Sequence, residues 1–316
     1  MAGPADAARE RARALVKLGR YPEAAAAARD GLASTPDDPG LILLLAVALC
    51  ESGHAPEALP VARQAVQMRP GDARAHRTLG WVTYKLGRHG EAADQLAHAL
   101  TLDPHDPESH IMRAEACIKQ AQRIRLKTRR RSGLIGEAEQ HAAEAVRLEP
   151  ASAGGYLVHG KASLASGNGT AAAAWAQQAL SVEPDHPVGH QVLGLAAQLR
   201  GDTRTAADHY LQAGKLNPRS DSSMKMLRSL RAAGPVSGIG LFIVIRLGLA
   251  SGGMGGGVVM AVLIGVTLVG LGLYRFVWPG WQARRSMSDE ARRALARDRE
   301  LRAGGSRFRP RPPGRR

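Results

Sequence analysis

The sequence predicts an all-α protein built from helix–turn–helix repeats, followed by an apolar region and a basic tail. Two observations predict this architecture. Across the first two thirds of the 316 residues, a glycine recurs at turn positions, and each is followed five residues later by alanine and twelve residues after that by proline. The second observation concerns residues 258–278, a 21-residue stretch in which Arg275 is the only charge. A stretch of this length and composition is typical of a membrane-spanning helix.

Residues 73–106 show most clearly why one repeat forms two helices. Gly87 predicts the turn that ends the first helix, and Pro104 predicts the end of the second after Asp103. Gly80 and Ala92 are small, as two closely crossing helices require. One such unit cannot bury its own apolar face, so it needs neighbours.

When the turn glycines are aligned, residues 5–220 divide into six consecutive units. The units are 5–38, 39–72, 73–106, 107–152, 153–186 and 187–220; five have 34 residues and the fourth has 46. The turn glycines are Gly19, Gly53, Gly87, Gly133, Gly167 and Gly201. The small residues are Ala24, Ala58, Ala92, Ala138, Ala172 and Ala206, and the closing prolines are Pro36, Pro70, Pro104, Pro150, Pro184 and Pro218.

This pattern resembles the tetratricopeptide repeat (TPR) family over about two thirds of the chain. In residues 73–106, His76, Leu79, Gly80 and Thr83 stand at the W-x2-L-G-x2-Y spacing, and Ala92, Leu96 and Pro104 fill the second half of the motif. The resemblance implies an α-solenoid with a concave groove lined by the first helices. The family's tryptophan position departs from the motif and holds Ala8, Ile42, His76, His110, Tyr156 and His190. Gly169 stands where the second helix of the fifth repeat usually opens with tyrosine.

The resemblance also implies which residues would contact a partner, namely positions 2, 5, 9, 12 and 13 of each first helix. The predicted groove residues at these positions are Arg74, Arg77, Trp81, Tyr84, Lys85, Lys119 and Lys161, with Leu43, Val47, Val188 and Leu195 towards the flanks. The predicted groove is therefore cationic around two aromatic residues and favours an acidic or amphipathic protein segment. The alternative is that Trp81 and Tyr84 only pack between repeats. Thr78 and Trp81 replace the asparagines of the carboxylate-clamp subtype, so recognition of a free C-terminal carboxylate is not expected.

The fourth repeat carries a basic insert at residues 121–132. Its cations are Arg123, Arg125, Lys127, Arg129, Arg130 and Arg131, and it has no acid. We expect the first helix to continue through the insert for about 18 Å, with Ser132 and Gly133 turning the chain back. One interpretation is a solvated helical extension, and the other is an anion-binding projection.

The net charge of +15 is concentrated in two places, the insert with +6 and residues 279–316 with +8. Without these, the repeats are nearly neutral. Cys50 and Cys117 fall inside first helices, which predicts small buried side chains in a reducing compartment. The N-terminus lacks the apolar segment of a secretory signal.

After the repeats, residues 221–233 predict a capping helix with Met224, Leu227 and Leu230 on one face. Residues 236–250 and 258–278 are apolar, and arginines flank the pair on both outer sides while the loop between them has no charge. By the positive-inside rule we expect a hairpin of two spans, with Tyr274, Trp278 and Trp281 at the interface. The alternative is one span and an interfacial helix, because Arg246 is costly inside a bilayer.

The segment after the apolar region predicts a charged helix capped at Ser288, and then a basic tail with nothing to pack. The predicted hairpin places the repeats and both termini in the cytoplasm of a bacterial cell.

No P-loop, H-E-x-x-H or C-x-x-C motif occurs. His76, His110 and His190 share one repeat position, so we interpret them as packing residues. We therefore expect no enzyme, metal or cofactor.

These features are consistent with two functions. The first is a membrane-anchored scaffold that recruits a protein partner through its groove. The alternative is a peripheral binder of polyanions, either anionic lipid or nucleic acid, which uses the insert and the tail; nucleic acid is the less expected of the two. Polyanion binding falls steeply with salt. The partner and the oligomeric state are not defined by the sequence.

Overall fold

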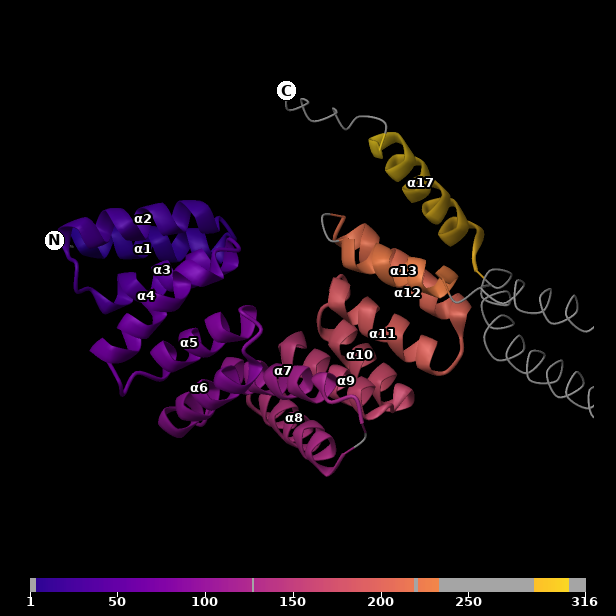
Figure 1. Ribbon diagram of the computed structural model, residues 1–316, viewed down its shortest axis with the longest axis horizontal. Coiled ribbons are helices and arrows are strands. Elements are labelled where there is room, and N and C mark those ends of the chain that lie inside the picture. The colour runs from indigo at the N-terminus through magenta and orange to yellow at the C-terminus, as the bar shows by residue number, and fades with distance from the viewer. Residues whose placement is uncertain (1–3, 127, 219–220, 233–286, 307–316) are drawn as a thin grey trace, which may run out of the picture. The chain divides into compact units, whose positions relative to one another are not determined.

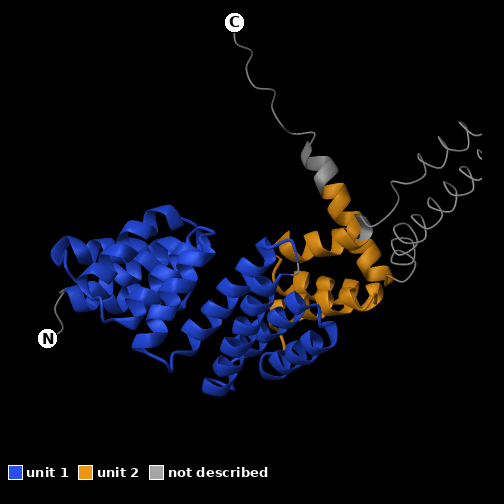
Figure 2. Ribbon diagram, turned by 60° about the horizontal axis from the view of Figure 1, so that its bottom comes forward, with its two compact units in different colours: residues 1–183 blue, residues 184–316 orange. Residues whose placement is uncertain are grey.

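A computed structural model describes residues 4–126, 128–218, 221–232 and 287–306 (Figure 1). The described residues form fourteen α-helices and contain no strand, which confirms the all-α repeat prediction. The chain divides into two compact units, Met1–Glu183 and Pro184–Arg316, coloured blue and orange in Figure 2.

The first unit holds five consecutive helix pairs. They are α1 (Pro4–Lys17) with α2 (Tyr21–Ser34), α3 (Pro39–Glu51) with α4 (Ala55–Met68), α5 (Ala73–Lys85) with α6 (His89–Leu102), α7 (Pro107–Arg123) with α8 (Arg129–Leu148), and α9 (Ala153–Ser166) with α10 (Gly169–Val182). From α2 to α8, each second helix contacts the first helices of its own and of the next repeat. Consecutive first helices also contact one another. The first helices thus form a continuous layer within this unit.

The predicted small residues lie where the paired helices cross. Ala24, Ala58, Ala92, Ala138, Ala172 and Ala206 are all fully buried. At the facing position, a Cβ added to Gly80 would come within 2.8 Å of Cγ of Leu96. Close helix crossing therefore requires small residues on both sides, because protein interiors leave no spare volume.

The turn glycines adopt the backbone that their position requires. Gly19, Gly53, Gly87, Gly167 and Gly201 have φ between 69° and 89°, a left-handed conformation that other L-residues adopt at a cost. Each ends a first helix and lets the second helix run back against it.

Gly133 was wrongly predicted to be the turn glycine of the fourth repeat. It lies inside α8, which begins at Arg129, whereas α7 ends at Arg123, so the chain turns before Gly133 is reached. Thr128 starts α8 earlier, because its backbone is extended and its side chain accepts a hydrogen bond from the N–H of Arg131 at 3.2 Å. The insert therefore lengthens both helices, and α7 ends at Arg123 instead of continuing through the insert.

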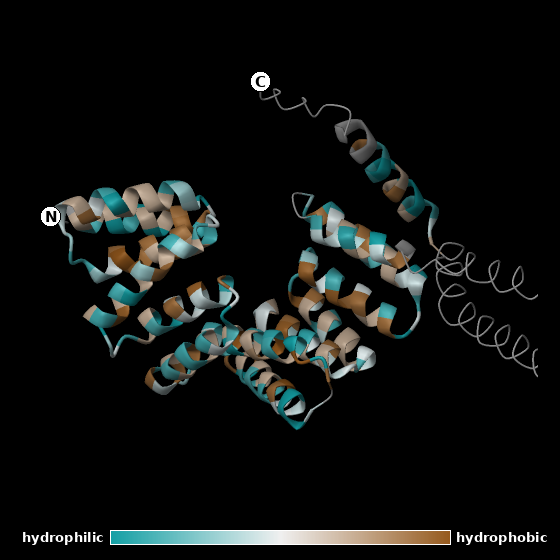
Figure 3. Cartoon of the chain, in the orientation of Figure 1, coloured by the Kyte–Doolittle hydropathy of each residue, from teal (hydrophilic) through white to brown (hydrophobic). Residues whose placement is uncertain are grey.

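The second unit contains α11 (Pro187–Leu199), α12 (Thr203–Leu216), α13 (Asp221–Ala232) and α17 (Asp289–Ser306). Its core joins α12 to both later helices: Tyr210 of α12 packs in one cluster with Leu227 and Leu230 of α13. Met287, just before α17, and Leu295 within it are buried in the same cluster. Hydrophobic residues are interspersed among hydrophilic ones along α17 (Figure 3), as in a helix with one packed face.

Among the described residues, no helix is both long and apolar enough to span a bilayer. The apolar stretches 236–250 and 258–278, and with them the predicted hairpin, lie outside the described residues. The same holds for the last ten residues of the basic tail.

Candidate partner-binding surface

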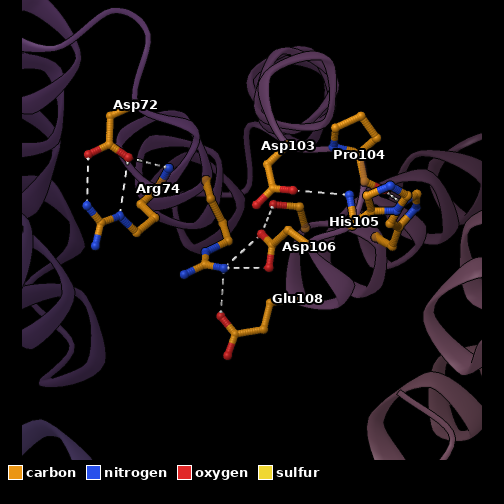
Figure 4. Close-up of polar contacts among 10 residues, drawn as sticks. Asp72, Arg74, Asp103, Pro104, His105, Asp106 and Glu108 are labelled. Atoms are coloured by element: carbon orange, nitrogen blue, oxygen red, sulfur yellow. Dashed lines mark hydrogen bonds and ion pairs between the residues drawn. The ribbon is translucent and has the colours of Figure 1, made fainter. Parts of the chain in front are cut away.

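Arg77 joins two successive first helices. Its guanidinium lies 2.8 Å and 2.7 Å from the two carboxylate oxygens of Asp106, the residue that precedes α7, and 3.1 Å from Glu108 (Figure 4). The residue at position 5 of the repeat makes a similar link in two other repeats. Arg9 binds Asp38 before α3, and Gln191 binds Ser222 and Ser223 of α13. The predicted groove residue Arg77 is therefore also part of the inter-repeat structure.

Asp38 shows the electrostatic effect of such a link. Burial alone raises the pKa of its carboxyl group, but hydrogen bonds from Arg9 and from the backbone N–H of Leu41 outweigh burial and lower it below the ordinary value. Arg74, in contrast, contacts the residue that caps its own helix. It folds back onto Asp72 at the start of its own helix, with its Nε and Nη2 3.3 Å from the carboxylate oxygens (Figure 4).

Trp81 is at the centre of an aromatic and charged cluster on α3 and α5. Its indole stacks on Tyr84 with a centroid separation of 5.3 Å and an interplanar angle of 8°. Nζ of Lys85 lies 4.4 Å from the centre of the indole ring, within cation–π range. Glu51 of the preceding repeat accepts the indole N–H and lies 3.4 Å from Lys85. Trp81 and Tyr84 are both half-buried, so each packs between repeats and still presents surface to solvent.

Glu115 of α7 extends this cluster into the next two repeats. It forms an ion pair with Lys161 of α9, and burial together with Glu115 raises the pKa of Tyr84. We call the set Glu51, Trp81, Tyr84, Lys85, Glu115 and Lys161 the Trp81 surface. It brings three of the five predicted groove residues of α5, and one from α9, into a continuous chain of contacts.

The acids of this surface were not predicted. Glu51 and Glu115 occupy positions 13 and 9 of their first helices, two of the positions that identified the cationic and aromatic groove residues. Applying the positional rule to acids as well as cations would have found them. Lys85 and Lys161 are each paired with an acid, and Arg77 with two, so acids partly neutralise these cations of the predicted groove. The surface carries mixed charge.

The other predicted groove residues are not members of the Trp81 surface. Nζ of Lys119 lies 3.5 Å from Gln122 of its own helix. Leu43 and Val47 are half-buried on α3. Val188 and Leu195 are half-buried on α11, in the second unit. No binding role for any of these residues is tested by the structure, so the groove assignment stays a prediction.

The shared histidine position links the two helices of a repeat. His76 and His110 each place Nε2 about 3 Å from a proline carbonyl, that of Pro70 or Pro104. Because a carbonyl only accepts, Nε2 must carry the proton. Nδ1 then faces Gln95 in the third repeat at 3.0 Å and Nδ1 of His141 in the fourth at 2.9 Å. His190 faces His209 in the same way at 3.3 Å.

The His110–His141 contact requires neutral imidazoles. Nδ1 of His110 accepts a hydrogen bond from the Nδ1–H of His141, whose Nε2 accepts a hydrogen bond from Nε of Arg113 at 3.1 Å. Burial, Arg113 and His110 together lower the pKa of His141 to about 4. Among the described residues, no three histidines, cysteines or acids are placed to hold a metal ion.

Both cysteines lie in the interior as free thiols. Burial raises the pKa of Cys50 to about 11 and that of Cys117 to about 12. Both are therefore protonated and unreactive at neutral pH.

The cations of the basic insert lie in different environments. Arg131 donates to the carbonyl of Ala165 in the next repeat at 3.1 Å, so it contributes to packing. Arg123 lies beside the turn at Gly87. Arg125, Arg129 and Arg130 are exposed, and Lys127 lies outside the described residues.

Comparison with known proteins agrees with this architecture. The sequence profile of the tetratricopeptide repeat family matches residues 2–39, 43–107 and 126–187, just over half of the chain. Among proteins with curated functions, none matches this sequence.

Solved structures with the same fold include a thermophilic TPR protein of Thermus thermophilus, with a TM-score of 0.56, 23% identity, and coverage of 61% of this chain and 99% of that chain. PilW, a type IV pilus biogenesis factor, gives a TM-score of 0.58, 18% identity, and coverage of 72% and 100%. The Cut9–Hcn1 hetero-tetramer structure gives 0.55, 20% identity, and coverage of 71% and 43%. The chain thus belongs to the tetratricopeptide repeat family, whose members are typically non-enzymatic scaffolds for protein–protein interaction.

Proposed function

We propose that this protein is a membrane-anchored adaptor that recruits a protein partner on the Trp81 surface, on the cytoplasmic side of a bacterial membrane. The observation that carries the proposal is the half-buried Trp81–Tyr84 stack, which lies in the layer of first helices with Lys85 over the indole. Tryptophan and tyrosine fixed by neighbouring side chains are common interface hot spots, because they bury large areas at little entropic cost.

The pairing of charges on this surface narrows the partner's chemistry. Lys85 and Lys161 each have a carboxylate partner already, so an acidic segment would gain less from them than from free cations. An amphipathic segment fits better. Its apolar residues would cover the indole and phenol rings, and its charges would compete with Glu51 and Glu115.

Trp81 fluorescence tests this site. In a variant whose other tryptophans, Trp175, Trp278 and Trp281, are replaced by phenylalanine, we expect acrylamide to quench Trp81. Partner captured from native membranes by crosslinking should then protect it. An emission that is blue-shifted and unquenchable without partner would mean that Trp81 only packs between repeats.

The apolar stretches 236–250 and 258–278 support the anchor, and the described residues on either side of them support its topology. Leu230 precedes the stretches and Met287 follows them, yet both are buried in the cluster around α12. Arg228 of α13 also lies 2.9 Å from Asp298 of α17. Two chain positions held together must lie on the same side of a membrane, which favours an even number of spans.

Reporter fusions test the topology. A reporter placed after residue 232 and one placed after residue 316 should both be active in the cytoplasm, and deletion of 236–278 should release the protein from membranes. Opposite locations for the two reporters would support a single span and contradict the hairpin.

A further inference from the structure

The turn between α7 and α8 presents an exposed leucine among exposed arginines. Leu126 has 74% of its surface accessible, one of the most exposed large apolar side chains among the described residues. Arg125 precedes it, and Arg129 and Arg130 open α8; all three are exposed and form no ion pair within the described part of the chain. The first turn of α8 contains no acid.

The packing of the repeat does not account for this combination. Arg131 is bonded to the next repeat through the carbonyl of Ala165, and Ile135 is buried one turn later. Within the described part of the chain, Leu126, Arg125, Arg129 and Arg130 make no such contact, and the insert that holds them is absent from the other five repeats. The described contacts therefore give Leu126 no packing role, and its exposure to water costs free energy.

The chemistry of these four residues fits a lipid surface better than a nucleic acid. Arginines attract phosphate in either ligand, but the exposed Leu126 has no aromatic face on which a base could stack. At a membrane, the same side chain can enter the boundary between head groups and acyl chains while the cations remain among anionic head groups.

We propose that the α7–α8 turn is a contact site for anionic lipid, in which Leu126 enters the membrane interface and Arg125, Arg129 and Arg130 bind head-group phosphates. This site is separate from the partner-binding surface and does not depend on the membrane spans, since a peripheral contact needs only the exposed turn. In an anchored protein it would fix how the repeats lie against the bilayer.

A fluorescent label on the turn tests the contact in the full-length protein. Leu126→Cys can be labelled selectively, because Cys50 and Cys117 are buried thiols with raised pKa values. The labelled protein is placed in membranes of phosphatidylcholine, or of an equal mixture with phosphatidylglycerol. We expect a blue shift, and quenching by lipids brominated in the acyl chain, only in the anionic mixture.

The double substitution Arg129→Gln and Arg130→Gln should raise the concentration of anionic lipid that is needed for the response roughly 30-fold, because each cation near the surface contributes about fivefold. The matched control is Arg63→Gln with Arg69→Gln, two exposed arginines of the second repeat, which should leave the response unchanged. No blue shift in the anionic mixture, or equal weakening by the control pair, would overturn the proposal. A shift caused by RNA and not by lipid would also overturn it, in favour of a nucleic-acid site.

The same labelling experiment distinguishes the lipid contact from the proposed membrane anchor. Protein retained in membranes with no shift of the label would contradict the lipid contact and leave the anchor standing. Protein that binds only anionic membranes, is released by salt and shows the shift would support the contact and contradict the anchor.

Discussion

At the scale of single residues, His141 makes the fourth repeat sensitive to acid. Its folded pKa of about 4 lies below the ordinary histidine value of 6.5, with burial as the main cause. The unfolded chain therefore binds a proton at a higher pH than the folded chain does. The stability that comes from a neutral His141 is complete above about pH 6.5 and is lost as the pH falls through 4.

We expect the contribution of His141 to lower the free energy of unfolding by about 2 kcal/mol when the pH falls from about 7.5 to about 5. His141→Gln should remove that share of the pH dependence, because the third repeat already pairs His76 with Gln95 at the same position. Denaturant unfolding at both pH values measures the difference. An unchanged pH dependence in the variant would show that His141 is not the group responsible.

Arg77 and Arg74 provide a second test at this scale, because they are neighbours with different environments. The side chain of Arg77 is 23% exposed and binds a 14% exposed Asp106, whereas that of Arg74 is 65% exposed. Arg77→Ala should destabilise the protein by about 1–3 kcal/mol, since it removes a mostly buried charge pair that joins α5 to the start of α7. Arg74→Ala should change stability by less than about 0.5 kcal/mol. Equal effects in denaturant titrations would show that the link to Asp106 is not structural.

At the scale of elements, substitution by alanine should have opposite effects on stability at Gly133 in the fourth repeat and at Gly167 in the fifth. Gly133 lies in α8, and a Cβ there meets nothing within 4 Å, so Gly133→Ala should stabilise the protein by about 0.5–1 kcal/mol. Gly167 has φ of 89° with the same open space, so Gly167→Ala should cost about 1–2 kcal/mol from the backbone alone. Thermal unfolding of the two variants compares them. Destabilisation by Gly133→Ala would mean that this glycine forms the turn after all.

The helix pairs could be predicted because each depends on local signals: a left-handed glycine, a small residue at the crossing and a proline at the end. The fourth turn could not be placed by the same signals, since Thr128 starts α8 five residues before the expected glycine. The lysines of the Trp81 surface followed from repeat positions, but their neutralisation by Glu51 and Glu115 depends on how the repeats stack. The docking of α17 depends on contacts with helices far away in the sequence, although Met287, Ala291 and Leu295 recur at helical spacing.

At the scale of the molecule, the second unit joins the sixth repeat to α17. Ser288 donates a hydrogen bond to Asp208 at 2.5 Å, and Lys215 lies 2.5 Å from Glu290. These contacts, with the buried Met287 and Leu295, hold the start of α17 against α12. The sixth repeat, α13 and α17 are thereby connected through one core cluster.

Site-specific photocrosslinking in native membranes tests most directly whether the Trp81 surface recruits a partner. A photoreactive amino acid is placed at Lys85, beside Trp81, or at Asp94, an exposed position on the second helix of the same repeat. We expect a discrete protein adduct from position 85 that is lost when Trp81 is also changed to alanine, and no such adduct from position 94. The same adduct from both positions, or one from position 85 that survives the loss of Trp81, would contradict recruitment through this surface.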